Sequence, residues 1–261
     1  MALIKFIEDV VSKEKSDLPL FYKLILLFLR LLSLIYGLAV NVRNQAYFRG
    51  LLVRKKLSVP VISVGNILAG GAGKTPTVLY LADLLKRQGH KPAILTKGYS
   101  AHVNTGVRRG DLVTPGTNPA VGGDEPVLLA RRLPGVPVLV GQDRYQSGRL
   151  AQSRFDSDVL LMDDGFQYLS LDRDLDLLVI DAARPLVQGL LPRGYLREPL
   201  SGLKRAHGFL LTRVDQASGK QLAEVESFLA KNFPGKTIFH ARYHPVGLVS
   251  YHSWVKSQSS S

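Results

Sequence analysis

The chain has 261 residues, 46% of them hydrophobic, so it is long and apolar enough for one large domain or one and a half ordinary ones. It contains no cysteine, which excludes disulfide bonds and thiol chemistry. Its formal net charge of +13 favours an anionic partner: nucleic acid, anionic lipid or a phosphorylated substrate.

The N-terminal segment is the most apolar part of the chain. Residues 1–17 alternate apolar and charged side chains, as a short amphipathic helix would. Residues 18–42 are much more apolar, although Lys23 and Arg30 interrupt the run. On a helical wheel the polar and small residues share one stripe roughly 80° wide. The stripe consists of Lys23, Arg30, Ser33, Gly37, Asn41 and Asn44.

Three interpretations of this segment stay open. The helix could lie in the membrane interface with its basic residues facing lipid headgroups, which we favour. It could instead cross the membrane, or form a core helix of the soluble domain. The basic residues that follow, between positions 43 and 56, favour an anionic, cytoplasmic leaflet.

Residues 59–88 predict a phosphate-binding loop. They read VPVISVGNILAGGAGKTPTVLYLADLLKRQ: an apolar strand, a glycine-rich turn and a helical pattern that runs to Gly89. Glycines let backbone N–H groups curl around phosphate oxygens, and the helix N-terminus adds positive partial charge. Lys74 would reach the β- and γ-phosphates, and Thr75 would place its hydroxyl on Mg²⁺. We expect nucleotide contacts from Leu68, Ala69, Gly70, Gly71, Ala72, Gly73, Lys74, Thr75 and Pro76.

The match to the pattern G-x-x-x-x-G-K-[ST] is incomplete. Leu68 stands where the pattern has its first glycine, although Gly70 and Gly71 keep most of the freedom of the loop. The alternative is a glycine-rich turn that happens to precede Lys-Thr. The register of strand, loop and helix favours the phosphate loop.

Beyond residue 90, apolar runs alternate with helical patterns. We expect strands at 92–97, 136–140, 158–162, 175–180 and 209–212, and helices at 127–133, 143–155 and 221–232. Residues 100–123 are polar and predict a long loop or small ribbon. This alternation predicts an α/β fold of the P-loop NTPase type, a mostly parallel sheet with helices on both faces. Ligands of such sheets bind beyond the carboxyl ends of the strands.

Acidic residues stand near those strand ends. Asp163 and Asp164 follow an apolar strand, where P-loop enzymes hold Mg²⁺; the alternative is that they cap the next turn. Asp124 opens a helical pattern and could be an N-cap.

Several arginines are further candidates. Arg144 and Arg149 fall in one helical pattern, where both could be ordinary surface charges. Arg193 and Arg197 lie in a basic loop at 191–200 and could clamp an anionic substrate or be solvated.

Taken together, several motifs resemble the tetraacyldisaccharide 4′-kinase family, the lipid A 4′-kinases. The motifs occupy residues 64–76, 96–99, 123–126, 143–145, 162–167, 173–176 and 191–199. The resemblance covers roughly residues 18–245. It implies a kinase at the cytoplasmic face of the bacterial inner membrane. Such a kinase transfers the γ-phosphate of ATP to the 4′-hydroxyl of a tetraacylated glucosamine disaccharide 1-phosphate, a lipid A precursor.

The resemblance also implies roles for single residues, with ATP and Mg²⁺ as cofactors. Asp124 would be the catalytic base, and Lys74 would act on the phosphates. The magnesium-site residues would be Thr75, Glu125, Asp163 and Asp164. The residues near the substrate would be Tyr99, Arg144, Gln167 and Arg197.

The expected partners are an anionic glycolipid substrate and the lipid surface of the inner membrane, and we expect a monomer. No aromatic-studded basic strand supports nucleic-acid binding. The rival hypothesis is a membrane-associated P-loop ATPase or GTPase with a regulatory role. Residues 211–215 faintly resemble the base-reading T-K-x-D of GTPases, with Arg213 for Lys. Ala69 stands where partitioning ATPases have a signature lysine, which counts against that class.

Two departures from the family stand out. Tyr168 replaces a usual histidine. Family members also continue into a second C-terminal lobe with an Asp-His motif, and none of the six histidines here follows an Asp. We expect an N-terminal segment at 1–45, a kinase domain at 46–245 with the start of a largely missing second lobe near its end, and a disordered Ser-rich tail at 246–261. We therefore expect binding of ATP and Mg²⁺ with weak or absent transfer.

Overall fold

A computed structural model describes residues 19–97, 111–186, 189–244, 247 and 250. The expected N-terminal amphipathic helix at 1–17 and the candidate Tyr99 lie outside these residues, as does the tail expected at 246–261 except for residues 247 and 250. The strands are β1 (Val61–Gly65), β2 (Pro92–Thr96), β3 (Asp111–Val113), β4 (Val138–Val140), β5 (Val159–Asp163), β6 (Leu175–Asp181), β7 (Gly208–Thr212) and β8 (Thr237–His240). The helices are α2 (Leu20–Phe48), α3 (Lys74–Arg87), α4 (Pro119–Gly122), α5 (Asp124–Arg132), α6 (Arg144–Phe155), the 3₁₀ helix η1 (Leu200–Arg205) and α7 (Gly219–Asn232).

The strands form one mostly parallel sheet, as the alternating pattern predicts. Their order is β3-β4-β2-β5-β1-β6-β7-β8, and only β3 runs antiparallel, against β4. Every strand and helix expected beyond residue 90 is present within a few residues of its expected bounds. Two elements fall within the stretch expected as a loop or ribbon, β3 and α4. Strand β8, which extends the sheet beyond β7, was not predicted from the sequence.

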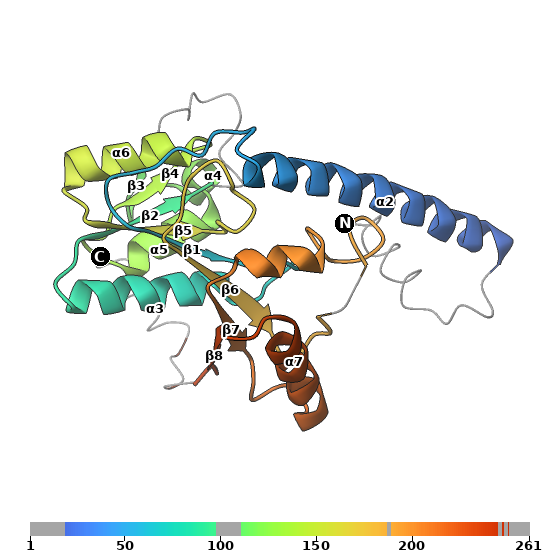
Figure 1. Cartoon of the computed structure of the whole chain (residues 1–261). Helices are drawn as coiled ribbons and strands as arrows, with labels where there is room; N and C mark the ends of the chain where they lie inside the picture. Colours follow the sequence, from blue (N-terminus) through green and yellow to red (C-terminus); the bar gives the residue numbers. More distant parts are fainter. Residues whose placement is uncertain (1–18, 98–110, 187–188, 245–246, 248–249, 251–261) are drawn as a thin grey trace.

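Helices cover both faces of the sheet (Figure 1). Neighbouring residues of β5 point to opposite faces, as the pleat requires. Leu161 packs in a cluster with residues of α3 and α5. Leu160 packs on the other face, in a cluster that includes Ala151 of α6. Strands β5, β1, β6 and β7 are neighbours and run parallel, so their carboxyl ends lie together at one edge of the sheet.

Helix α3 follows the phosphate loop and ends where the sequence predicts. Gly89, with φ of +89°, follows the C-cap Gln88. The N–H of Gly89 donates to Lys86 O and that of His90 to Leu85 O, at 3.1 and 3.0 Å. This is a Schellman motif, in which a glycine takes the left-handed position that other residues disfavour.

Helix α2 is longer than expected, and part of it projects beyond the sheet (Figure 1). Its buried residues are Leu29, Ser33, Gly37 and Val40. Two members of the polar stripe, Ser33 and Gly37, therefore face the protein. Their small size lets the helix approach the loop at Leu190 closely. A Cβ on Gly37 would come within 2.7 Å of Leu190 Cδ1. The core-helix interpretation is also wrong, because only 17% of the most apolar window is buried.

Candidate active site

The phosphate loop connects β1 to α3 at the carboxyl edge of the sheet. Gly70 and Gly73 have φ of +111° and +90°, conformations that residues with a Cβ rarely adopt. Thr212, at the end of β7, donates its hydroxyl proton to Ala72 O at 2.8 Å and steadies the loop. Among the described residues, no protein acceptor lies within hydrogen-bond range of the N–H groups of residues 71–75. These donors suit an anion at the start of α3.

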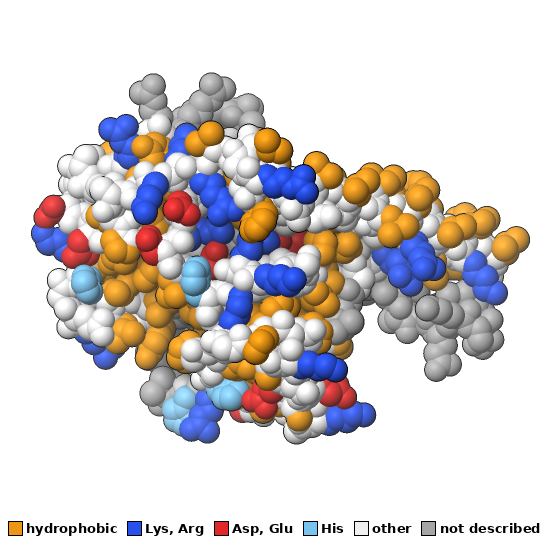
Figure 2. Space-filling view, in the orientation of Figure 1, with side chains coloured by type: hydrophobic (Ala, Val, Ile, Leu, Met, Phe, Trp, Pro, Cys, Tyr) orange, Lys and Arg blue, Asp and Glu red, His pale blue; other side chains and the backbone are white. Residues whose placement is uncertain are grey.

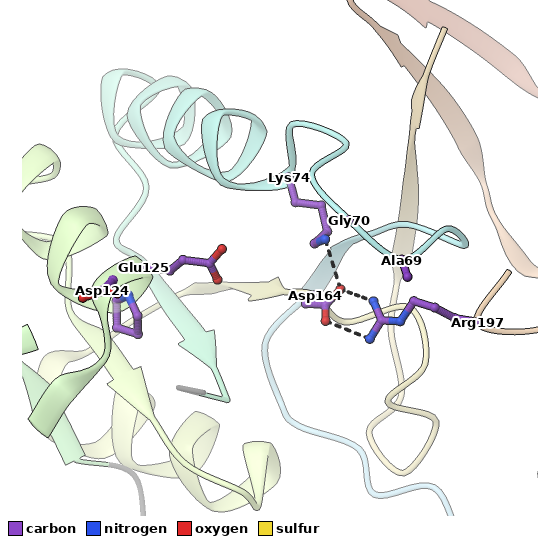
Figure 3. Close-up of a pocket in the computed structure, with 8 residues that line it drawn as sticks. Ala69, Gly70, Lys74, Asp124, Glu125, Asp164 and Arg197 are labelled. Atoms are coloured by element: carbon purple, nitrogen blue, oxygen red, sulfur yellow. Dashed lines mark hydrogen bonds and ion pairs between the residues drawn. The ribbon is translucent and has the colours of Figure 1, made fainter. Parts of the chain in front are cut away.

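A cavity of about 430 Å³ lies beside this loop. Its lining comes from four separate stretches of the chain: Ala69, Gly70, Lys74, Asp124, Glu125, Pro126, Asp164 and Arg197. The fold thus brings together the predicted phosphate loop, the acids at the start of α5, the end of β5 and the basic loop. Figure 3 shows Lys74, Asp164 and Arg197 pointing toward one another across it.

Asp164 is the centre of the charged cluster in the cavity. Its carboxylate accepts two hydrogen bonds from the Arg197 guanidinium, at 2.7 and 3.0 Å. Lys74 Nζ lies 3.6 Å from Asp164 Oδ1. Burial alone would raise the pKa of Asp164, but the hydrogen bonds and charge of Arg197, helped by Lys74, hold that pKa below its usual value. In this structure Arg197 pairs with a carboxylate of the protein itself, and its contact with an anionic substrate stays a prediction.

Asp163 has the opposite environment. Burial, followed by the charges of Glu125 and Asp164, raises its pKa to about 6, against the lowering effect of Lys74 and Arg144. Its Oδ1 is buried without a hydrogen-bond partner among the described residues. A buried carboxylate without a partner is costly unless a cation or donor joins it.

The residues present fit a magnesium ion. No group of three or more His, Asp or Glu side chains converges within the described part of the chain. However, Mg²⁺ in P-loop enzymes takes one or two protein ligands and completes its shell with water and phosphate oxygens. Asp163 has the unpartnered oxygen, and Thr75 stands in the first turn of α3. The assignment of individual acids as ligands of the ion stays a prediction.

Asp124 and Glu125 open α5 at the rim of the cavity. The interpretation of Asp124 as the N-cap is wrong, because Gly123 takes that position with φ of +87°, and no side chain caps the helix. The Asp124 carboxylate is therefore not used by the helix terminus. In Figure 3 Glu125 points toward Lys74, whereas Asp124 lies farther from it.

Arg144 holds the end of β5 in place. Its guanidinium donates to the carbonyl oxygens of Asp163 and Asp164, at 2.9 and 3.3 Å, and lies 4.8 Å from the centre of the Tyr168 ring. It is 4% exposed, so the interpretation as a surface charge is wrong for Arg144, whereas Arg149 on the same helix is exposed. A direct contact of Arg144 with substrate stays a prediction.

Gln167 links two of the segments that line the cavity. Its amide donates to Asn66 O and to Glu198 Oε1, both at 2.9 Å. Glu198 is fully buried and also accepts from Arg205. Neither Asn66 nor Glu198 was predicted as a site residue, although both lie inside family motifs, at 64–76 and 191–199. Their position within those motifs was the signal that could have found them.

The chain matches a known protein family. Residues 25–257 match the family described as tetraacyldisaccharide-1-P 4′-kinase. A tetraacyldisaccharide 4′-kinase of Desulfatibacillum aliphaticivorans is 40% identical over 228 residues, which are 85% of this chain and 59% of that protein. One of Syntrophus aciditrophicus is 43% identical over 238 residues, 86% of this chain and 62% of that protein.

A solved structure agrees with the sequence matches. It is the crystal structure of LpxK from Aquifex aeolicus, described as an "apo" form in complex with ATP. The two superpose with a TM-score of 0.70 and 40% identity, covering 83% of this chain and 64% of that one. The chain spans about three fifths of the length of these curated relatives.

Proposed function

The chain belongs to the tetraacyldisaccharide-1-P 4′-kinase family, and from this membership we propose that it is the catalytic part of an ATP-dependent lipid kinase. The reaction moves the γ-phosphate of ATP to the 4′-hydroxyl of a tetraacylated glucosamine disaccharide 1-phosphate. The observation that carries the proposal is the shared cavity, in which the phosphate-loop lysine faces the acids at the start of α5 and the end of β5.

The chemistry follows from the residues around this cavity. The 4′-hydroxyl oxygen bonds to the γ-phosphorus while the bond from that phosphorus to the β–γ bridging oxygen breaks, and ADP leaves. The hydroxyl proton goes to a carboxylate, for which we propose Asp124, since its side chain makes no capping bond and lines the cavity. The phosphate oxygens accept hydrogen bonds from the N–H groups of residues 71–75 and from the Lys74 ammonium, which stabilise their negative charge.

The cation proposed for this site is Mg²⁺, which neutralises charge on the β- and γ-phosphate oxygens when bound. Thr75 and Asp163 would hold it, with Glu125 and Asp164 close by. Lys74 and Arg197 both form ion pairs with Asp164. A γ-phosphate would compete with Asp164 for Lys74 and draw the lysine into the phosphate site.

The membrane is the proposed location of the substrate. The ten large apolar side chains that form the apolar face of α2 are all more than half exposed: Leu20, Phe21, Leu24, Leu27, Phe28, Leu31, Leu34, Ile35, Leu38 and Val42. Figure 2 shows hydrophobic side chains, in orange, along the projecting arm, with basic side chains on the same arm. We propose that this face enters the cytoplasmic leaflet of the bacterial inner membrane and that the +13 charge serves anionic headgroups and substrate rather than nucleic acid. A monomer would suffice, which size-exclusion chromatography in detergent tests.

The test is a γ-phosphate transfer assay with labelled ATP and a disaccharide 1-phosphate glycolipid in detergent micelles. Wild-type protein should label the lipid, at the low rate expected from its sequence. Asp124→Asn should lower turnover about 10²–10⁴-fold, the usual range for acid–base assistance, with ATP affinity unchanged. Labelled ATP that yields only free phosphate, with no labelled lipid, would contradict the kinase proposal.

A further inference from the structure

We propose that Tyr36 of α2 is a positioning residue, which fixes the loop of residues 189–198 so that Arg197 holds Asp164 beside the phosphate loop. Helix α2 would then support the active site mechanically, in addition to any contact with lipid. The catalytic consequence rests on the proposed function; the structural coupling does not.

The first contact joins α2 to the loop. The Tyr36 hydroxyl donates to the carbonyl oxygen of Arg197 at 2.6 Å, across 161 positions of sequence. One turn before it, Ser33 Oγ accepts from the N–H of Arg193 at 3.0 Å and lies 2.9 Å from Leu190 O. About two turns after it, Asn44 Nδ2 donates to the buried Glu198 at 3.2 Å. The docking stripe of α2, defined as Ser33, Tyr36, Gly37 and Asn44, is therefore polar or small.

The second set of contacts joins the loop to the phosphate loop. The N–H of Arg197 donates to Ile67 O at 2.8 Å, and the N–H of Ala69 donates to Tyr195 O at 2.7 Å. These bonds hold residues 195–197 antiparallel to the start of the phosphate loop, with Leu68 opposite Leu196. Arg197 also places Nη1 3.4 Å from Asn66 Oδ1. Movement of this loop would therefore move the first half of the phosphate loop.

Arg197 is consequently fixed from three directions. Its N–H is bound by the phosphate loop, its carbonyl by Tyr36, and its guanidinium by Asp164. The guanidinium lines the cavity, whereas Tyr36 is not among the residues that line it. Tyr36 therefore acts through Arg197 rather than on a reactant. Small errors in the placement of such a charge are amplified, because a displacement of about 1 Å can cost on the order of 10²-fold in rate.

The experiment removes only the hydroxyl, with Tyr36→Phe in the full chain. The control is Tyr47→Phe on the same helix, whose side chain makes no hydrogen bond within the described residues. Amide hydrogen exchange is measured first and needs no activity. Exchange at Arg197 and Ala69 should speed up about threefold or more in Tyr36→Phe and stay unchanged in Tyr47→Phe. Unchanged exchange at both amides would overturn the coupling.

The second arm measures kcat and KM for ATP in the glycolipid assay. Tyr36→Phe should lower kcat about tenfold with little change in KM, and the effect should nearly vanish in an Arg197→Lys background. An equal loss in both backgrounds would overturn the idea that Tyr36 acts through Arg197. If wild-type protein labels no lipid, the proposed function fails, and the exchange measurement still decides the coupling.

Discussion

Helix α2 and the central sheet use the same apolar residue types in opposite ways. In β5, Leu160, Leu161 and Met162 are completely buried. On α2, Leu31 is 55% exposed and Leu34 is 64% exposed, while Ser33 and Gly37 are buried. The apolar side chains of the sheet are buried, whereas most of those on α2 are exposed. The side of α2 that packs on the protein mixes Ser33 and Gly37 with Leu29 and Val40.

Apolar side chains are thus covered by the rest of the chain in the sheet and left exposed on α2. Strand side chains are covered by helices of the same chain, which is the ordinary route to a core. A contiguous exposed apolar surface of the size seen on α2 is unusual for a soluble monomer and marks a binding surface for lipid or protein. The described chain has one helix long and apolar enough to cross a membrane, α2 itself.

The largest expected effect is a loss of phosphate transfer, which depends on the carboxyl edge of the sheet, without a loss of membrane binding, which depends on α2. Lys74→Ala removes the cation nearest the phosphates and should lower phosphate transfer about 10²–10³-fold, since the reaction depends on charge stabilisation. Sedimentation with anionic vesicles should stay at the wild-type level, because α2 is unchanged. A Lys74→Ala variant with wild-type turnover and ATP affinity would contradict the phosphate-loop assignment.

The second prediction compares one leucine from each region. Leu161→Ala leaves a cavity in the core and should lower the free energy of unfolding by about 2–5 kcal/mol. Leu31→Ala should change it by less than about 0.5 kcal/mol and instead weaken vesicle binding several-fold, because less apolar surface enters the bilayer. Denaturant titration measures the free energy of unfolding, and vesicle sedimentation measures membrane binding. Equal loss of stability in both variants would mean that α2 is a core helix.

The third prediction concerns the cost of burying Asp163. Its pKa rises from 3.8 in the unfolded chain to about 6 in the folded one. As pH rises, Asp163 loses its proton at a lower pH in the unfolded chain than in the folded one. The free energy of unfolding therefore falls between about pH 4 and pH 6 and stays at the lower value above pH 6. Asp163→Asn should be more stable than wild type by about 1–3 kcal/mol at pH 7, without nucleotide or Mg²⁺.

Thermal melts of both proteins from pH 4 to pH 8 measure this difference. It should shrink toward pH 4, and adding Mg²⁺ with ATP should stabilise wild type more than the variant. A difference that does not depend on pH would show that Asp163 keeps an ordinary carboxylate in the fold.

The smallest expected effect lies where the two regions touch. Ser33→Ala removes a buried hydroxyl that bonds the loop at Leu190 and Arg193, and should cost about 1 kcal/mol, or a few degrees in Tm. Leu34→Ala, on the exposed neighbouring position, is the matched control. A Ser33→Ala melting curve identical to that of wild type would argue against the docked position of α2.

The sequence by itself determined most of the elements and the position of the phosphate loop, but not β3, α4 or β8. Period-2 and period-3.6 patterns report local geometry, so β1, α3 and the later alternation were predictable, as was the C-cap glycine at position 89. Motifs in the right order also identified the family, because each motif is a short run of neighbouring residues.

Only the tertiary structure decided which side of α2 is buried and which partner each charge has. A helical wheel shows that Ser33 and Gly37 share a stripe, but not whether lipid or protein covers it. Arg197 pairs with Asp164 across 33 positions, and Arg144 binds the end of β5 across 19. Such contacts depend on the order of strands in the sheet, which brings distant loops to one edge, and no local periodicity records that order.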